Sequence, residues 1–385
     1  MEKELRNPWF ILIFFTYPVV LLWPHCIICI REKNDETMNN TVCYSSNDMK
    51  KRYEQYDNFK GILILLVVVG HLCEIMPFPE ARGSYAIIYL FHMPAFIFLS
   101  GMFGKFDMKR ILKHLVLPYF VFQTLYLLFA REVLGTKLKF QYHKPYWILW
   151  YLMAMIWWNL LLAVLALKQR YLRYLIWVIS IGLSLWIGTV SSVSYDYTLS
   201  RTIVYLPFFL WGYYFRHSSF FEKCQEESFR SSKGYRTVAV LFAVLATIAI
   251  AVVMMHRSAI NAKWFYGAYP YEKLHYHAGI RGAQLVAAAV IIVVVLMFLP
   301  EKKIPVLGTI GQRTMPIFLL HGFVIRYMKY AKVWNRLEQA GFPVKGGMGI
   351  LLLLLLAAGI VALIMALTYL WDKLKAKCLW GFGTK

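Results

Sequence analysis

Eleven stretches of the 385-residue chain are apolar, and each comes close to the length that crosses a lipid bilayer as a helix. A spanning helix needs about 20 mostly apolar residues, because each residue adds about 1.5 Å to a helix and the hydrocarbon core is about 30 Å thick. The stretches lie approximately at residues 8–30, 61–79, 85–103, 115–130, 146–167, 174–190, 202–215, 237–256, 280–299, 314–330 and 348–371. We therefore predict an all-α polytopic membrane protein with about eleven transmembrane helices.

Composition supports a single membrane domain. Hydrophobic residues make up 59% of the chain and charged residues 16%, whereas soluble domains average about 45–50% and about 25%. We expect residues 1–55 to hold one N-terminal transmembrane helix and a polar cytoplasmic linker, and residues 56–385 to hold a ten-helix core. The first helix could instead be a cleaved signal peptide, but Pro18 and Pro24 interrupt it and no small-residue cleavage site follows.

The formal net charge of +22 comes from Lys and Arg clusters that separate the apolar stretches. Nucleic-acid binding would require such residues on one soluble face, so we expect no nucleic-acid partner. Loops rich in Lys and Arg remain in the cytoplasm. If residues 31–60 are cytoplasmic, that side holds the larger share of the basic residues. This count predicts an external N-terminus and a cytoplasmic C-terminus.

Several kinds of functional site are not indicated by the sequence. The six cysteines are scattered and do not suggest a disulfide framework. Cys26 and Cys29 form a CxxC motif after His25, but no second pair of ligands accompanies it, so we expect no metal site. The chain also has no phosphate-binding glycine loop and no GxSxG motif, which argues against ATP-driven transport and soluble-hydrolase chemistry.

Three histidines, His71, His92 and His321, lie inside apolar stretches. An ionisable side chain within a membrane helix is energetically costly, so by default it marks a functional site or an internal polar pair. The three histidines are therefore the first candidates for chemistry.

His71 has polar neighbours at helical spacing. Lys60 precedes it by eleven residues, which returns to nearly the same helix face about 16 Å away along the axis. Asp57 lies one turn before Lys60, and Glu74 lies where it can orient the imidazole. A neutral histidine can accept the proton of an alcohol that attacks a thioester, and a lysine can pair with donor phosphates. The alternative is a snorkelling lysine and a hydrogen-bonded bundle histidine.

Other residues near helix ends could contribute to binding. Arg201 could bind a phosphate or an acyl carbonyl. Arg110 and Arg281 likewise lie near the ends of predicted helices. Ordinary anchoring of the helix ends is the alternative for each arginine. Trp150 could stack on an adenine or a sugar, or it could belong to an aromatic belt at the membrane interface.

Six blocks of residues occur in a characteristic order along the chain. They are Tyr56-Asp57-Asn58-Phe59-Lys60-Gly61 with Val67-Val68-Val69-Gly70-His71; Phe91-His92-Met93-Pro94-Ala95-Phe96 with Leu99-Ser100-Gly101; Leu117-Pro118-Tyr119; Trp150-Tyr151-Leu152; Ser200-Arg201-Thr202 with Pro207-Phe208-Phe209; and Leu307-Gly308 with Leu320-His321-Gly322. In combination they resemble the membrane acyltransferase family 3, in particular its branch of fucose O-acetylase-like proteins.

The resemblance implies a ten-helix enzyme in a bacterial plasma membrane. Such an enzyme takes an acyl group from cytoplasmic acetyl-CoA or another acyl-CoA and attaches it to a carbohydrate hydroxyl. By the same resemblance His71 is the catalytic base, and Lys60 and Arg201 belong to the donor-binding side. His92 and Ser100 are expected nearby on the next helix. Some relatives carry an appended hydrolase-like domain that completes the transfer, and the 385 residues leave no room for one.

We therefore expect an acyl-CoA-dependent O-acyltransferase without a permanently bound cofactor. Its expected partners are acyl-CoA, a carbohydrate acceptor (a polysaccharide, a glycan or a lipid-linked sugar) and the lipid bilayer, and a homodimer is possible. The alternative function is a transporter or flippase for a lipid-linked sugar or a surface polymer, in which the histidines relay protons.

Overall fold

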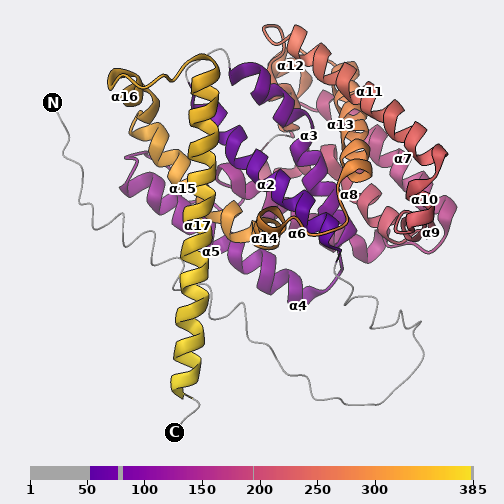
Figure 1. The fold of residues 1–385 in the computed structure, drawn as a ribbon, viewed down its shortest axis with the longest axis horizontal. Helices are drawn as coiled ribbons and strands as arrows, with labels where there is room; N and C mark the ends of the chain where they lie inside the picture. The colour runs from indigo at the N-terminus through magenta and orange to yellow at the C-terminus, as the bar shows by residue number, and fades with distance from the viewer. Residues whose placement is uncertain (1–52, 77–80, 194, 383–385) are drawn as a thin grey trace.

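The computed structural model describes residues 53–76, 81–193 and 195–382, and these ranges contain helices and loops but no β-strand (Figure 1). The all-α prediction is therefore confirmed. The helix expected at residues 8–30 lies outside the described residues, as do Cys26 and Cys29.

Each of the ten predicted stretches within the described residues forms a helix or a continuous run of helical turns. They are α2 (Glu54–Ile75), α3 (Ala81–Met102), the run of α4 (Met108–Ile111), η1 (Leu112–Val116) and α5 (Leu117–Glu132), η2 (Trp147–Leu149) with α6 (Trp150–Leu165), α7 (Arg170–Trp186), α8 (Leu199–Arg216), α11 (Lys233–Met255), α13 (Ala278–Phe298), α15 (Thr314–Tyr330) and α17 (Gly346–Phe382). Shorter turns and helices are η3 (Ile187–Thr189), η4 (Asp196–Thr198), α9 (Ser219–Lys223), α10 (Glu227–Ser231), η5 (Ala262–Tyr266), α12 (Tyr271–Leu274), α14 (Pro305–Gln312) and α16 (Val333–Gln339).

Eight helical spans among the described residues are long and apolar enough to cross a membrane. The two remaining predicted segments correspond to α8, which includes Arg201 and Arg216 in its 18 residues, and to α15, which has 17 residues. The polytopic membrane fold is thus confirmed, whereas the predicted count of eleven spans is not.

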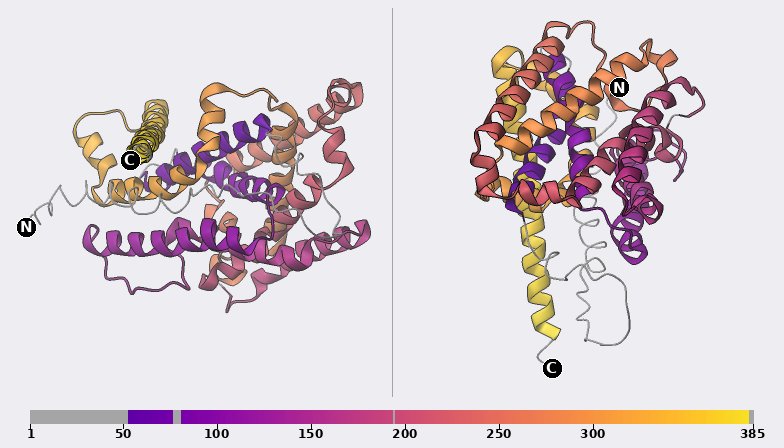
Figure 2. Two further views of the ribbon diagram at one scale, coloured as in Figure 1. Left: turned by 90° about the horizontal axis from the view of Figure 1, so that it is seen from below. Right: turned by 90° about the vertical axis from the view of Figure 1, so that its right-hand side faces the viewer.

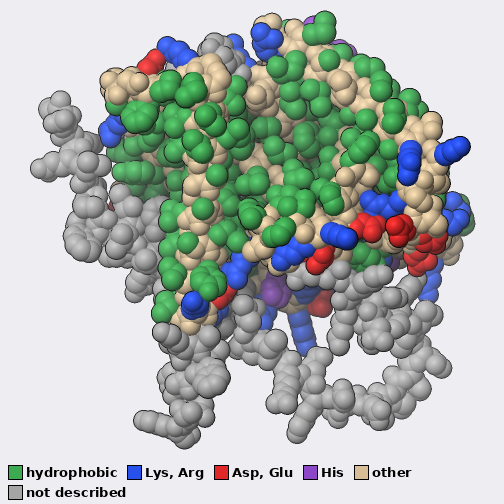
Figure 3. Space-filling model, in the orientation of Figure 1, with side chains coloured by type: hydrophobic (Ala, Val, Ile, Leu, Met, Phe, Trp, Pro, Cys, Tyr) green, Lys and Arg blue, Asp and Glu red, His purple; other side chains and the backbone are tan. Residues whose placement is uncertain are grey.

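Helices α2 and α3 form the centre of the bundle. Helix α2 packs against α3, α14, α15 and α17, and α3 packs against α8 and α13. The buried share of the most apolar window is 67% in α3 but only 17% in α11. Figure 2 shows α17 standing at one side of the bundle and reaching past it, and Figure 3 shows a broad hydrophobic face with charged side chains gathered along its edges. This distribution is the one expected for a bundle surrounded by lipid.

Glycines let the central helices touch backbone to backbone. A Cβ atom added at Gly311 would lie 1.7 Å from the carbonyl oxygen of Asp57, and one added at Gly61 would lie 2.2 Å from that of Leu307. Helices α3 and α8 meet in the same way, since a Cβ at Gly212 would lie 1.9 Å from the Phe98 oxygen. Close contact of this kind drives helix association in membranes.

Replacement of Gly212 by alanine should therefore destabilise the bundle. The added methyl group would meet backbone that cannot rotate away, and overpacking of this kind costs about 2 kcal/mol or more. The measurement is the midpoint of thermal unfolding of the detergent-purified protein. Gly359→Ala in α17 is the matched control, because nothing lies within 4 Å of the added Cβ. Equal midpoints for the two variants would contradict the close contact between α3 and α8.

Candidate active site

Helix α2 carries polar residues near both ends. Near its start, the Lys60 ammonium lies 3.4 Å from an Asp57 carboxylate oxygen and 4.5 Å from the ring centre of Phe103. Near its end, His71 Nδ1 lies 3.4 Å from a Glu74 carboxylate oxygen. Both pairs have the neighbours that helical spacing predicts. The residues between the two pairs are apolar except for Gly61 and Gly70.

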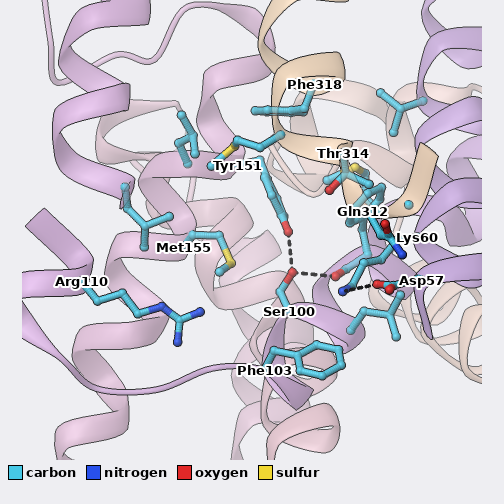
Figure 4. A pocket seen from close by; sticks show the side chains of 18 residues that line it. Asp57, Lys60, Ser100, Phe103, Arg110, Tyr151, Met155, Gln312, Thr314 and Phe318 are labelled. Atoms are coloured by element: carbon cyan, nitrogen blue, oxygen red, sulfur yellow. Dashed lines mark hydrogen bonds and ion pairs between the residues drawn. The ribbon is translucent and has the colours of Figure 1, made fainter. Parts of the chain in front are cut away.

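A cavity of about 320 Å³ begins beside the Lys60 pair (Figure 4). Its charged lining residues are Asp57, Lys60 and Arg110, and Arg110 is exposed. Farther along α2 the wall includes Val67, which is buried and lies one helical turn before His71. The remaining lining residues are Met93, Phe96, Leu99, Ser100, Phe103, Leu115, Tyr151, Leu152, Met155, Gly311, Gln312, Thr314, Met315 and Phe318. The cavity thus combines a charged, accessible end with a largely apolar interior.

Ser100 contributes a hydroxyl to this cavity from α3. Its Oγ donates to the Phe96 carbonyl oxygen at 2.8 Å and lies 2.5 Å from the Tyr151 hydroxyl (Figure 4). Because the Ser100 proton is engaged by the carbonyl, the Tyr151 hydroxyl is the donor to Ser100. The pair therefore forms a polar point in an otherwise apolar wall.

The surroundings of His71 differ from those of an ordinary bundle histidine. In addition to the Glu74 carboxylate, the Tyr89 hydroxyl lies 3.1 Å from Nδ1. The imidazole packs against Trp147, with ring centres 4.5 Å apart, and against His321, with ring centres 5.5 Å apart. Donation from Nδ1–H to the carboxylate or the phenol leaves the lone pair on Nε2. This is the arrangement that a histidine base requires.

His92 and His321 use Nδ1 to bond to their own helices. In His92 the acceptor is the Ile88 carbonyl at 2.6 Å, and in His321 it is the Ile317 carbonyl at 2.8 Å. Both side chains are buried, and Nε2 of His321 has no hydrogen-bond partner among the described residues. Of the three histidines, only His71 has a carboxylate within ion-pair distance in the described ranges. His71 is therefore the best candidate for a base.

Arg201 lies at the His71 end of the bundle. Its Nε–H donates to the Tyr266 carbonyl at 3.1 Å, and its guanidinium lies 4.7 Å from the Trp150 ring centre. The Tyr266 ring lies 5.1 Å from that of Tyr89, which bonds to His71. Trp150 therefore lies beside Arg201 at the His71 end of the bundle.

The structure does not bring Arg201 together with Lys60, although both were expected on one donor-binding side. Helices α3 and α8 run parallel. Near their starts both meet Tyr266, which contacts Tyr89 of α3 and Arg201 of α8, and near their ends Phe98 of α3 packs against Trp211 and Phe215 of α8. The start of α8, which carries Arg201, is consequently remote from the end of α3, where Phe103 contacts Lys60. Sequence order alone could not reveal this separation.

Arg281 has the contacts of a structural residue. Its side chain is 1% exposed and donates to the carbonyl oxygens of Ser184 and Tyr269 at 3.1 and 3.2 Å. It also donates to the Tyr276 hydroxyl at 2.5 Å and lies 4.6 Å from the Tyr271 ring centre. These contacts tie α13 to α7 and to the loop that contains α12. Of the predicted binding arginines, only Arg110 lines the cavity with Lys60.

Sequence reasoning did not identify Tyr89, Tyr266 or the role of Trp147 as a neighbour of His71. Tyr89 approaches His71 from the next helix, so spacing along one helix cannot reveal the contact. Trp147 has a backbone φ of 41°, an unusual value for a residue other than glycine. No group of three or more His, Cys, Asp and Glu residues that could hold a metal ion occurs in the described part of the chain.

Comparison with known proteins identifies the family. The model of a family described as an acyltransferase domain matches residues 53–369. The chain is also similar to the nodulation protein NolL of Sinorhizobium fredii, with 37% identity over 60 residues. That alignment covers 14% of this chain and 16% of NolL. No solved structure matches the chain.

The structural role of Arg281 can be tested by the variant Arg281→Gln. Glutamine is too short to reach all three acceptors, and a buried acceptor left without a partner costs about 1–3 kcal/mol. We expect a lower midpoint of thermal unfolding. Arg257→Gln, which alters an exposed arginine, should leave the midpoint unchanged. An unaltered midpoint for Arg281→Gln would show that these contacts do not support the bundle.

Proposed function

Because the chain belongs to the acyltransferase family whose domain spans residues 53–369, we propose that it transfers an acyl group, and specifically acetyl, from cytoplasmic acyl-CoA to a hydroxyl of a carbohydrate. The observation that carries this proposal is the cavity along α2. It starts at Lys60 and Arg110 and reaches Val67, one turn before His71.

The two ends of this cavity match the two ends of an acyl-CoA molecule. The nucleotide end of CoA carries phosphates, which Lys60 and Arg110 can pair with as cations. The pantetheine arm is uncharged and suits the largely apolar interior. Lys60 and His71 are eleven residues apart on one helix, or about 16 Å. An acyl-CoA that extends from Lys60 along α2 therefore directs its thioester towards His71.

His71 then acts as the general base. Its Nε2 takes the proton of the acceptor hydroxyl as that oxygen attacks the thioester carbonyl. The new C–O bond forms, the C–S bond breaks, and the proton passes from His71 to the departing CoA thiolate. The Glu74 carboxylate stabilises the imidazolium that forms between these two proton transfers. The products are the ester and free CoA.

The acceptor reaches His71 from the end opposite to Lys60. Aromatic rings are concentrated there, including Trp147 beside His71 and Tyr266 beside Tyr89. Flat aromatic faces suit the apolar faces of sugar rings, which supports a carbohydrate acceptor. In this proposal the Lys60 end faces the cytoplasm of a bacterium and the His71 end opens towards the outer face of the plasma membrane.

Transfer of label from acetyl-CoA tests the role of His71. General bases contribute about 10²–10⁴-fold to a rate. His71→Ala should therefore lower the rate of acyl transfer from radiolabelled acetyl-CoA, or of its slow hydrolysis, by that factor. The affinity for acetyl-CoA and the midpoint of thermal unfolding should stay unchanged. Glu74→Gln, which keeps the imidazole, should have a smaller effect. Full activity of a folded His71→Ala variant would exclude the base. Acyl-CoA-independent transport driven by a proton gradient would instead support a transporter.

The donor site can be tested separately. Lys60→Gln and Arg110→Gln should each raise KM for acetyl-CoA about tenfold, because each removes a charge-assisted contact with a phosphate. Arg170→Gln is the matched control, since Arg170 is exposed and starts α7 outside the cavity lining. The same KM for all four proteins would contradict donor binding at Lys60.

A further inference from the structure

The guanidinium of Arg201 has unused hydrogen-bonding capacity. Its Nε–H bonds to the Tyr266 carbonyl, and within the described ranges its two terminal nitrogens have no hydrogen bond and no carboxylate within ion-pair distance. The residue is partly exposed. A charged side chain at this position in a membrane bundle is expected to have a counter-ion.

Arg201 is also held in a fixed orientation. Its guanidinium carbon lies 4.7 Å from the ring centre of Trp150 and 5.2 Å from that of Tyr195. The bond from Nε to Tyr266 adds a third constraint. A planar guanidinium that is fixed in this way can present two parallel N–H groups to a phosphate or a carboxylate with little loss of side-chain entropy.

The neighbouring charges favour an anion. Arg281 and Lys273 both contact Tyr269, whose ring lies 5.4 Å from that of Tyr195. Nearby acidic groups are otherwise engaged, and Glu74 pairs with His71 at 3.4 Å. Asp196 pairs with Lys144 at 3.1 Å, and Glu272 accepts a hydrogen bond from Ser191 at 3.1 Å. The surroundings of Arg201 therefore carry more positive than negative charge.

Arg201 is close to the reaction centre but does not contact it. The Tyr266 residue that holds Arg201 packs against Tyr89, and the Tyr89 hydroxyl lies 3.1 Å from His71. Two aromatic residues thus separate Arg201 from the base. A group bound at Arg201 would belong to a part of the acceptor adjacent to the acylated hydroxyl.

We propose that Arg201 binds an anionic group of the acceptor, a phosphate or a carboxylate, so that the enzyme acylates negatively charged glycans. This inference rests on the proposed function, because it assigns the substrate that approaches from the His71 end. It also removes Arg201 from the donor site. The anion can come from a lipid-linked sugar phosphate or from an acidic sugar of a soluble glycan.

Two matched pairs of probes distinguish these sources. The first pair is decyl glucosyl phosphate and neutral decyl glucoside, which partition into the membrane. The second is glucuronic acid and neutral methyl glucoside, which remain in water. Saturable binding of each radiolabelled probe is measured with the full chain in nanodiscs of phosphatidylcholine, a zwitterionic lipid without net charge. The wild type should prefer the anionic member of at least one pair by about tenfold or more.

Variants of Arg201 supply the decisive comparison. Arg201→Gln should abolish the preference for the anion, and Arg201→Lys should restore only part of it, because lysine keeps the charge but not the planar fork. Arg131→Gln, which alters an exposed arginine paired with Glu132, should keep the full preference. Equal binding of anionic and neutral probes by the wild type, or an unchanged preference in Arg201→Gln, would overturn the inference.

Acetyl-CoA binding, measured with the same samples, separates this inference from the proposed function. We expect Arg201→Gln to bind acetyl-CoA as tightly as the wild type. Loss of acetyl-CoA binding in this variant with retention of the anion preference would return Arg201 to the donor site and overturn the inference. If the wild type binds no acetyl-CoA while Arg201 still determines the anion preference, the anion site stands and the proposed donor is wrong.

Discussion

The close backbone contact between α2 and α14 is the constraint on which the candidate site depends. Gly61 and Gly311 allow the two helices to approach so closely that no side chain fits between them. Polar side chains reinforce this contact, since Asn58 donates to the Lys302 carbonyl at 2.8 Å and accepts from the Ile304 N–H at 3.0 Å. As a result, the end of α14 lines the cavity beside Lys60.

From this fixed start, α2 joins two polar environments through an apolar stretch. Ionisable side chains are costly inside a bilayer, and α2 confines them to its first turns and to its end at His71 and Glu74. A single rigid helix therefore sets the separation between the cation that can hold a donor and the imidazole that can act on it. The geometry of the proposed reaction thus follows from the pitch of a helix.

Helical spacing explains why part of the site could be predicted. The ten core stretches form helices, and the neighbours of Lys60 and His71 on α2 are those that a turn of three or four residues implies. Contacts within one helix depend only on local geometry. The division of the chain at residue 55 stays a prediction, because most of the N-terminal part lies outside the described residues.

Contacts between helices could not be predicted in this way. The position of Arg201 depends on the parallel packing of α3 and α8, and the burial of Arg281 depends on α7 and on the loop that contains α12. Tyr89 likewise approaches His71 from α3. In each case the sequence shows the residue type. Tertiary packing determines at which end of the bundle the residue lies and which partner it contacts, and the sequence does not show either.

The most direct test of the account is an electron cryo-microscopy structure with a bound, non-hydrolysable acetyl-CoA analogue. The account predicts the CoA phosphates beside Lys60 and Arg110, the pantetheine arm along α2, and the acyl carbonyl next to His71. Phosphates beside Arg201, or an acyl group remote from His71, would contradict it.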